Sequence, residues 1–226
     1  TAFTEKEARK KIQESKWSKA VLISKLKQPF LAEHKKKTIG FILIGFALGL
    51  NFTTFQTVEA FLMGELKDND FVSLLILVAG LGSMVVYGLT GILADKFGRK
   101  NILLLYAAAF TVGVIGLSVV VPAQNYWGCI IFIFIADIGY WGCFTLSKVF
   151  CVECFPTEIR GGSTGFRSFA YAIGLTLGSL ISAGLTRVVS LGTSYVINML
   201  WVTILIPTVV LFLLPETRGK EIVYED

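Results

Sequence analysis

The sequence predicts an all-α membrane protein with six transmembrane helices, and two features of the chain lead to this fold class. Its 226 residues are 54% hydrophobic and 16% charged, and most charges lie between long apolar stretches. A membrane-spanning helix needs about 20 mainly apolar residues to cross a hydrocarbon core of about 30 Å. Several stretches reach that length, and the basic residues between them gather on one side of the predicted bundle.

Stretches without any charge locate the spans in order. They cover residues 38–58, 71–94, 101–136, 168–186 and 188–215. The third stretch is too long for one span, and Pro122 with the polar residues after it divides it, because proline ends a helix. The predicted helices are therefore residues 38–62, 71–94, 101–121, 126–154, 165–189 and 194–214.

The distribution of Lys and Arg predicts that both termini are cytoplasmic. Of the 21 basic residues, 18 lie in four segments on one side of the predicted bundle: residues 1–37, the loop after the second helix, the connection after the fourth helix, and the tail. Basic residues accumulate in cytoplasmic segments, so these parts face the cytoplasm of a multi-pass plasma-membrane protein. The formal net charge of +5 then reflects contact with anionic lipid headgroups, and no nucleic-acid partner is expected.

The chain divides into three parts. Residues 1–37 form a basic segment that we expect to lie on the membrane surface as an interfacial helix or linker. Residues 38–214 form the six-helix bundle, and residues 215–226 form a cytoplasmic tail. Because position 1 is Thr rather than Met, the chain is expected to be a piece of a longer or processed polypeptide.

Enzymatic chemistry is not predicted. All four cysteines lie in residues 126–154, and His34 is the only histidine, so neither a disulfide framework nor a zinc site is expected. The sequence has no phosphate-binding loop for ATP. We therefore expect no cofactor, no metal ion and no enzyme activity, and we expect an ion gradient as the energy source.

The first motif lies in the predicted cytoplasmic turn between the second and third helices. Gly91 and Gly98 let backbones approach and turn, while Asp95 at a helix C-terminus needs a nearby cation, which Arg99 can supply. A loop that is merely basic explains the positive charges but neither the paired glycines nor the acid. The pattern resembles the signature loop of the major facilitator superfamily, which recurs between the second and third helices of each half.

Two further motifs resemble the sugar-transporter-like branch of that superfamily. Glu153 and Arg160 flank a Phe-Pro-Thr sequence after the fourth helix, and Glu216 and Arg218 follow the last helix. The resemblance covers residues 38–220. It implies the C-terminal half of a twelve-helix transporter, helices seven to twelve, whose N-terminal six-helix half is missing from this chain.

The chain departs from the sugar-porter pattern at two places. The first helix keeps Asn51 but lacks the glutamine pair of typical sugar porters. The Gly-Pro-rich stretch and the tryptophan before the Glu153-like acid are also absent, and Lys148 lies nearby instead. The resemblance extends to organic-ion and metabolite:proton symporters, so a charged metabolite is as reasonable a substrate as a hexose.

Polar residues inside the predicted membrane region point to a substrate path. Asp137, Trp141, Thr145 and Lys148 follow one another at helical spacing and share one face of the fourth helix. Charged groups are rare and usually functional at this depth. We expect Asp137 to take up a proton or bind a cationic group, and Lys148 to attract an anionic substrate or take part in gating. Hydration of Asp137 from outside and snorkelling of Lys148 to the cytoplasm are the alternatives.

The first predicted helix adds a second group of candidates. Asn51 and Phe55 share a face, with Gln56 beside it, near the middle of the membrane. Amide and aromatic groups suit the orientation of a hydroxylated or aromatic solute, although aromatic residues at this spacing also serve as packing.

These features predict a secondary active transporter for a small organic solute such as a sugar, an organic acid or another metabolite. Its mechanism would be alternating access with proton-coupled symport. A cytoplasmic charge network would hold the cytoplasmic side of the transporter closed. Its members would be Asp95, Arg99, Glu153, Arg160, Glu216 and Arg218. The alternatives are a six-helix receptor or scaffold that binds without transporting, and a half-transporter that acts as a homodimer.

Overall fold

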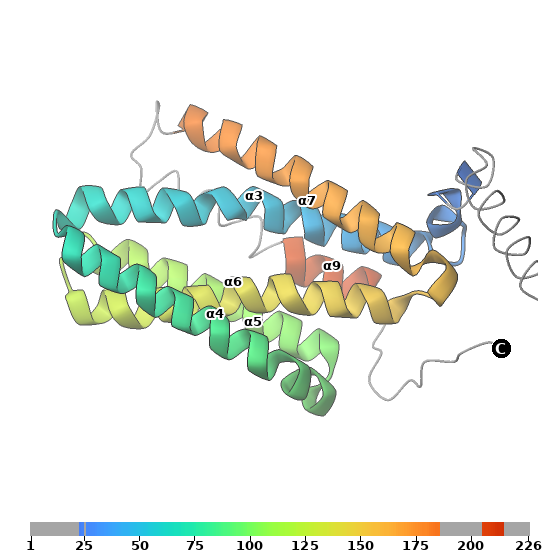
Figure 1. The fold of residues 1–226 in the computed structure, drawn as a ribbon, viewed down its shortest axis with the longest axis horizontal. Coiled ribbons are helices and arrows are strands. Elements are labelled where there is room, and N and C mark those ends of the chain that lie inside the picture. Colours follow the sequence, from blue (N-terminus) through green and yellow to red (C-terminus); the bar gives the residue numbers. More distant parts are fainter. Residues whose placement is uncertain (1–22, 25, 186–204, 215–226) are drawn as a thin grey trace, which may run out of the picture.

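The computed structural model describes residues 23–24, 26–185 and 205–214, and all regular structure in these ranges is helical. The prediction of an all-α protein is confirmed for this part of the chain. The elements are η1 (Gln28–Phe30), α3 (Lys35–Leu66), α4 (Asn69–Phe97), α5 (Arg99–Val120), α6 (Tyr126–Cys154), α7 (Thr157–Leu185) and α9 (Ile206–Leu213), and Figure 1 shows their arrangement.

The helix bounds agree with the prediction where local signals are strong. Helix α6 covers the predicted residues 126–154, and α5 ends at Val120, two residues before Pro122. Asn125 caps α6, because its side chain accepts a hydrogen bond from the backbone N–H of Gly128. Proline and an Asn cap therefore fix the turn that divides the long apolar stretch.

The prediction that the fifth helix begins at residue 165 is wrong. Helix α7 begins at Thr157, directly after Pro156, and Glu158 lies in its first turn. Proline suits the start of a helix, and an acidic residue there interacts favourably with the helix dipole. Arg160, which the prediction placed in the connection before the fifth helix, is therefore helical. Arg167 was counted with the basic residues of that connection although the predicted helix 165–189 contains it, and its side chain is fully buried.

The turn between α4 and α5 is shorter than predicted. Gly91 and Asp95 belong to α4, and Gly98 is the single non-helical residue between the two helices. Its φ of 94° lies in a region that favours glycine, and its N–H donates to the carbonyl of Ala94. This turn places Arg99 at the first position of α5, beside the end of α4.

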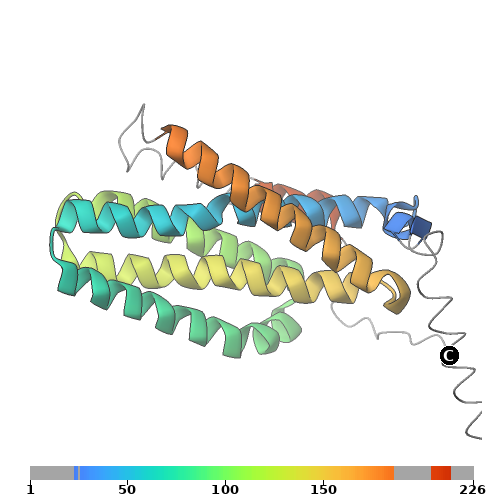
Figure 2. The ribbon, with the colours of Figure 1, turned by 45° about the horizontal axis from the view of Figure 1, so that its top comes forward.

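The helices pack in two groups. Helix α7 lies along α3, and α6 packs against α4 and α5, while α9 contacts α3 and α5 (Figures 1 and 2). Glycines allow the close approach of α3 and α7, because a Cβ at Gly49 would collide with the carbonyl of Tyr171 and one at Gly174 with the carbonyl of Phe46. Such contacts between small residues hold membrane helices together.

Three helices in the described part of the chain are long and apolar enough to cross a membrane, namely α4, α5 and α6. Large apolar side chains on α4 remain exposed, among them Leu77, Met84 and Ile92. The remaining spans and their total of six stay predictions. Most of segment 1–37 and the tail from residue 215 lie outside the described residues.

Candidate functional site

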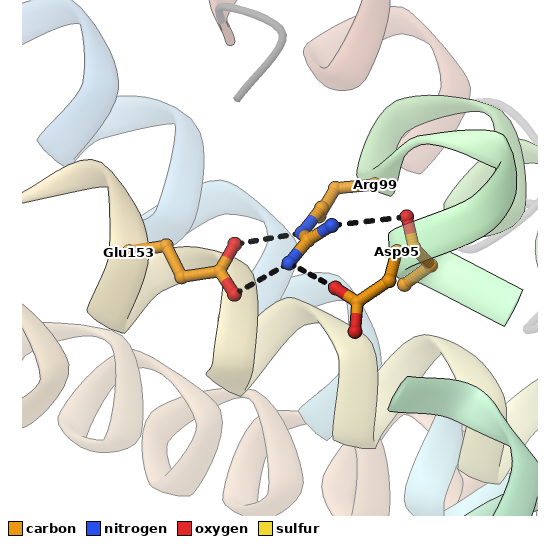
Figure 3. A network of polar contacts seen from close by, with 4 residues as sticks. Asp95, Arg99 and Glu153 are labelled. Carbon is orange, nitrogen blue, oxygen red and sulfur yellow. Dashed lines mark hydrogen bonds and ion pairs between the residues drawn. The ribbon is translucent and has the colours of Figure 1, made fainter. Parts of the chain in front are cut away.

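The network of ion pairs at one end of the bundle centres on Arg99. Its Nε donates to Oε2 of Glu153 over 2.8 Å, and its Nη2 donates to Oε1 of the same carboxylate over 3.0 Å. Nη2 also forms an ion pair with Asp95, and Nη1 donates to the carbonyl of Ala94 over 3.1 Å. Figure 3 shows these contacts. We call Asp95, Arg99 and Glu153 the Arg99 cluster, and their end of the bundle the motif end.

The Arg99 cluster joins the end of α4, the start of α5 and the end of α6. The side chains of Arg99 and Glu153 are 16% and 21% exposed, whereas that of Asp95 is 69% exposed. The bidentate contact with Glu153 is therefore the better shielded of the two ion pairs. The sequence-based expectation that Arg99 is the cation for Asp95 is confirmed.

The other predicted motif residues do not join this cluster in the described structure. A Cβ added at Gly91 would meet no atom within 4 Å, so the predicted close backbone approach at Gly91 is wrong among the described residues. Within the same residues Arg160 forms no ion pair with Glu153, and Nε of Arg160 is buried without a hydrogen-bond partner. Glu216 and Arg218 lie outside the described residues.

Asp137 lies in the interior of the bundle, where α6 faces α4. The residue is 3% exposed, and a Cβ added at Gly82 of α4 would lie 3.2 Å from its Oδ2. That oxygen has no hydrogen-bond partner among the described residues. The indole of Trp141, one turn along α6, and the backbone of Ser83 are polar groups that interact with the carboxylate.

Four aromatic contacts form a chain through the bundle, and three of them join different helices, whereas the contact between Trp141 and Phe144 lies within α6. Tyr87 of α4 lies 6.2 Å from Trp141, and Trp141 lies 5.6 Å from Phe144 on α6. Phe144 lies 5.3 Å from Tyr171 of α7, which in turn lies 6.4 Å from Phe52 of α3. All distances join ring centres. We call these five residues the aromatic wall, and it connects four helices that are distant in sequence.

Two cations lie against one ring of the aromatic wall. The Nζ atom of Lys148 is 3.9 Å from the centre of the Phe144 ring, and Cζ of Arg167 is 5.6 Å from the same centre. Nη2 of Arg167 donates to the hydroxyl of Ser147 and, over 3.2 Å, to the carbonyl of Phe144. Lys148 is exposed, whereas Arg167 is fully buried.

Arg167 is the site residue that the sequence reasoning missed. The signal was present, because a helix that begins after Pro156 carries Arg160 and Arg167 on the same face, seven residues or about two turns apart. Counting Arg167 with the basic residues of the connection, although the predicted helix 165–189 contains it, concealed its place in the interior.

The predicted residues of the first helix are placed only in part. Asn51 is buried and donates from Nδ2 to the carbonyl of Ala47 over 3.0 Å, and its Oδ1 has no partner among the described residues. Phe55 and Gln56 belong to α3, and their side chains lie outside the described residues. Thr145 is half-buried on α6, between Trp141 and Lys148.

The four cysteines of α6 form no disulfide within the described residues. In the same part of the chain, no group of three or more His, Cys, Asp or Glu side chains lies close enough to hold a metal ion.

Comparison with known proteins identifies relatives over most of the bundle. The family model of the Major Facilitator Superfamily matches residues 40–223. Myo-inositol transporter 2 of Cryptococcus neoformans is 28% identical over 160 residues, which cover 65% of this chain and 28% of that protein. Sialic acid transporter NanX of Escherichia coli is 24% identical over 163 residues, which cover 72% of this chain and 38% of that protein. The chain thus spans about a third of the length of these relatives.

The fold is also that of a solved transporter. The proton:xylose symporter XylE of E. coli superposes with a TM-score of 0.61 and 18% sequence identity, over 77% of this chain and 42% of that one. At this identity the likeness shows the fold alone. The relatives and the fold belong to membrane transporters, not to enzymes.

Proposed function

Because this chain belongs to the major facilitator superfamily, we propose that it is the C-terminal six-helix half of a secondary active transporter, helices seven to twelve, and that it moves a small organic solute by alternating access. One observation carries this proposal beyond family membership. The Arg99 cluster ties three helix ends together at one end of the bundle, while unpaired charges and the aromatic wall lie further inside. Ion pairs that can form and break at one end of the bundle, beside an interior with polar groups, are compatible with alternating access.

The proposed topology places the motif end in the cytoplasm. The excess of Lys and Arg in residues 1–37 and in the connections at that end supports cytoplasmic termini and a plasma-membrane location. Residues 1–37 serve as the basic linker, residues 38–214 as the six-helix bundle and residues 215–226 as the tail. The complementary half of the substrate path comes from six N-terminal helices that are not part of this chain.

The proposed solute site lies on the interior faces of α3 and α6. One member of this site, Trp141, belongs to the aromatic wall. We assign six residues to the site: Asn51, Phe55, Gln56, Trp141, Thr145 and Lys148. Aromatic faces and a few convergent polar groups are typical of small-molecule sites. The printed names of the relatives, which include carriers of myo-inositol and sialic acid, support a polyol, sugar or sugar-acid solute.

Proton coupling is assigned to Asp137. A carboxylate this deeply buried, with one oxygen unpartnered, is costly to keep charged in a bilayer, and protonation removes that cost. Its contact with Gly82 places it where α4 and α6 would slide past each other during the transport cycle. A proton on Asp137 therefore favours one packing of these helices over the other.

Gating is assigned to the Arg99 cluster together with Arg160, Glu216 and Arg218. Each ion pair of this kind contributes little stability by itself, about 0 to 1 kcal/mol. Pairs that exist in only one conformation still bias the equilibrium between the inward-open and outward-open states. The single-residue turn at Gly98 makes the relative position of α4 and α5 sensitive to Arg99.

Solute counterflow tests the proposed function. The native full-length protein is reconstituted into proteoliposomes that are preloaded with unlabelled polyols, sugars or sugar acids, and the entry of the same labelled solute is followed. Saturable counterflow is expected for at least one of these solutes. Binding of a solute without any counterflow would favour a receptor and contradict the proposal.

A further inference from the structure

Two positive charges, one exposed and one buried, lie against the same aromatic ring. Lys148 and Arg167 come from different helices, and both lie within cation–π distance of Phe144. Like charges so close together repel each other, and the repulsion is stronger away from water. We call Lys148 and Arg167, which share the Phe144 ring, the interior cation pair.

No carboxylate neutralises the interior cation pair within the described residues. The hydrogen-bond partners of Arg167 are a hydroxyl and a backbone carbonyl, both uncharged, and its Nε has no partner there. Lys148 forms no ion pair in the same part of the chain, and its charged neighbour is Arg167. Arg99, in contrast, has two carboxylates.

The burial of Arg167 makes the imbalance costly. Arg167 is ten residues after the start of α7 at Thr157, which corresponds to about 15 Å along the helix axis at about 1.5 Å per residue, and its side chain is fully buried. Charged residues inside a membrane bundle pair with one another or mark the path of a substrate. The uncompensated positive charge of Arg167, with Lys148 on the same ring, therefore favours an anion from outside this chain's own residues.

Lys148 and Arg167 differ in exposure, so they would act on a ligand in different ways. Lys148 is exposed and can touch a ligand that lies on the aromatic wall. Arg167 is fully buried behind Phe144 and is held by Ser147, so it acts on such a ligand through its charge and through the position of the Phe144 ring. Phe144 itself contacts both Trp141 and Tyr171, so a ligand beside Lys148 is also beside the aromatic wall.

We propose that Lys148 binds the carboxylate of a small ring-shaped organic acid whose body lies on the aromatic wall, and that Arg167 is a positioning residue that strengthens this anion site from behind Phe144. The inference rests on the proposed transport function and specifies its substrate class as organic acids rather than neutral sugars. It involves no covalent step.

Paired probes test the proposal on the native full-length protein. Each pair consists of an acid and its neutral counterpart: D-glucuronate with D-glucose, D-galacturonate with D-galactose, and nicotinate with nicotinamide. Equilibrium binding is measured by titration calorimetry. A hydrogen bond to a charged group contributes about 1.5–3 kcal/mol, so we expect at least one acid to bind about tenfold or more tightly than its counterpart. The proposal is overturned when no acid of the three binds more tightly.

Two variants test whether Lys148 causes the preference for the acid over its neutral counterpart. Lys148→Met should reduce the affinity for the acid to that for its neutral counterpart. Lys96→Met is the matched control, because Nζ of Lys96 also lies over a phenylalanine ring, 5.4 Å from the centre of Phe97, but at the motif end. It should leave the preference for the acid intact. Equal losses in the two variants contradict the proposal.

A second pair of variants tests the positioning role of Arg167. Arg167→Lys keeps the positive charge and should retain most of the preference for the acid, whereas Arg167→Met should lose it. Both proteins are first checked for a single peak in size-exclusion chromatography. When Arg167→Lys folds yet loses the preference as completely as Arg167→Met, the charge of Arg167 is not what matters, and its assigned role is wrong.

Counterflow with the same probes separates this inference from the proposed function. An acid that binds selectively but shows no counterflow supports the anion site and contradicts transport. Counterflow of the acid and the neutral solute with equal affinity supports transport and overturns the anion site.

Discussion

Charged side chains of the Arg99 cluster are paired at the motif end of the bundle, but those in its interior lack charged partners among the described residues. At the motif end, Arg99 is surrounded by the carboxylates of Asp95 and Glu153, and its guanidinium makes four contacts with protein atoms (Figure 3). In the interior, Asp137 has an oxygen without a partner, and Arg167 has only neutral partners among the described residues.

This difference separates two functions that sequence motifs alone do not separate. Charged side chains that pair with each other can bias a conformational equilibrium. They have little remaining charge or hydrogen-bonding capacity for a ligand. Unpaired buried charges are unfavourable until a proton or an ion reaches them. We therefore assign gating to the motif end and recognition of protons and solutes to the interior.

The largest expected effect comes from separating α3 from α7. A Cβ at Gly49 would collide with the carbonyl of Tyr171, so Gly49→Ala forces the helices apart and displaces Arg167 with α7. Overpacking of this kind typically destabilises a protein by about 1–3 kcal/mol. A thermal melt in detergent measures the loss. Gly80→Ala, whose added Cβ meets no atom within 4 Å of the described residues, is the control, and equal melting temperatures would contradict the predicted packing.

The second prediction concerns energy coupling. Asp137→Asn removes the group that we assign to proton uptake but keeps its size, so proton-driven accumulation of the solute should be abolished while counterflow continues. Uptake is measured in proteoliposomes with and without an imposed pH gradient. Accumulation that survives unchanged in the variant would remove Asp137 from the coupling mechanism.

A smaller effect is expected at the Arg99 cluster. Arg99→Gln leaves the partly shielded carboxylate of Glu153 without its cation, so the transport rate should fall by about tenfold while solute affinity stays within about twofold, since charge at this end sets conformational bias. Counterflow rates and titration calorimetry measure the two quantities separately. An unchanged rate would show that the cluster is not a gate.

The smallest effect is expected for Asp95. Its side chain is 69% exposed, so Asp95→Asn removes only a weak ion pair with Arg99 and should change the transport rate by about twofold to threefold. The distribution of spin-label distances across the motif end should show a modest change in the ratio of the inward-open to the outward-open population. If both the rate and the populations stay the same, Asp95 has no part in gating.

Local sequence signals were sufficient for much of the fold. The bounds of α6 and the break at Pro122 follow from proline, an Asn cap and the absence of charge, all of which act within a few residues. The ion pair of Asp95 with Arg99 is likewise an i,i+4 contact that helical spacing predicts.

The interior could not be predicted in the same way because its contacts join distant parts of the chain. Arg167 is tolerated in a helix since Ser147 and Phe144, about 20 residues earlier, accept its hydrogen bonds. The aromatic wall needs four helices to be placed side by side. The predicted start at residue 165 came after the charged residues Glu158 and Arg160, whereas α7 begins before them at Thr157.

One comparison tests the central claim most directly: the affinity and the counterflow rate of the same organic acid, measured in parallel for Lys148→Met and Arg99→Gln. We predict that Lys148→Met loses affinity, whereas Arg99→Gln keeps its affinity and loses rate. If both variants lose the same quantity to the same extent, the division between a gating end and a binding interior is contradicted.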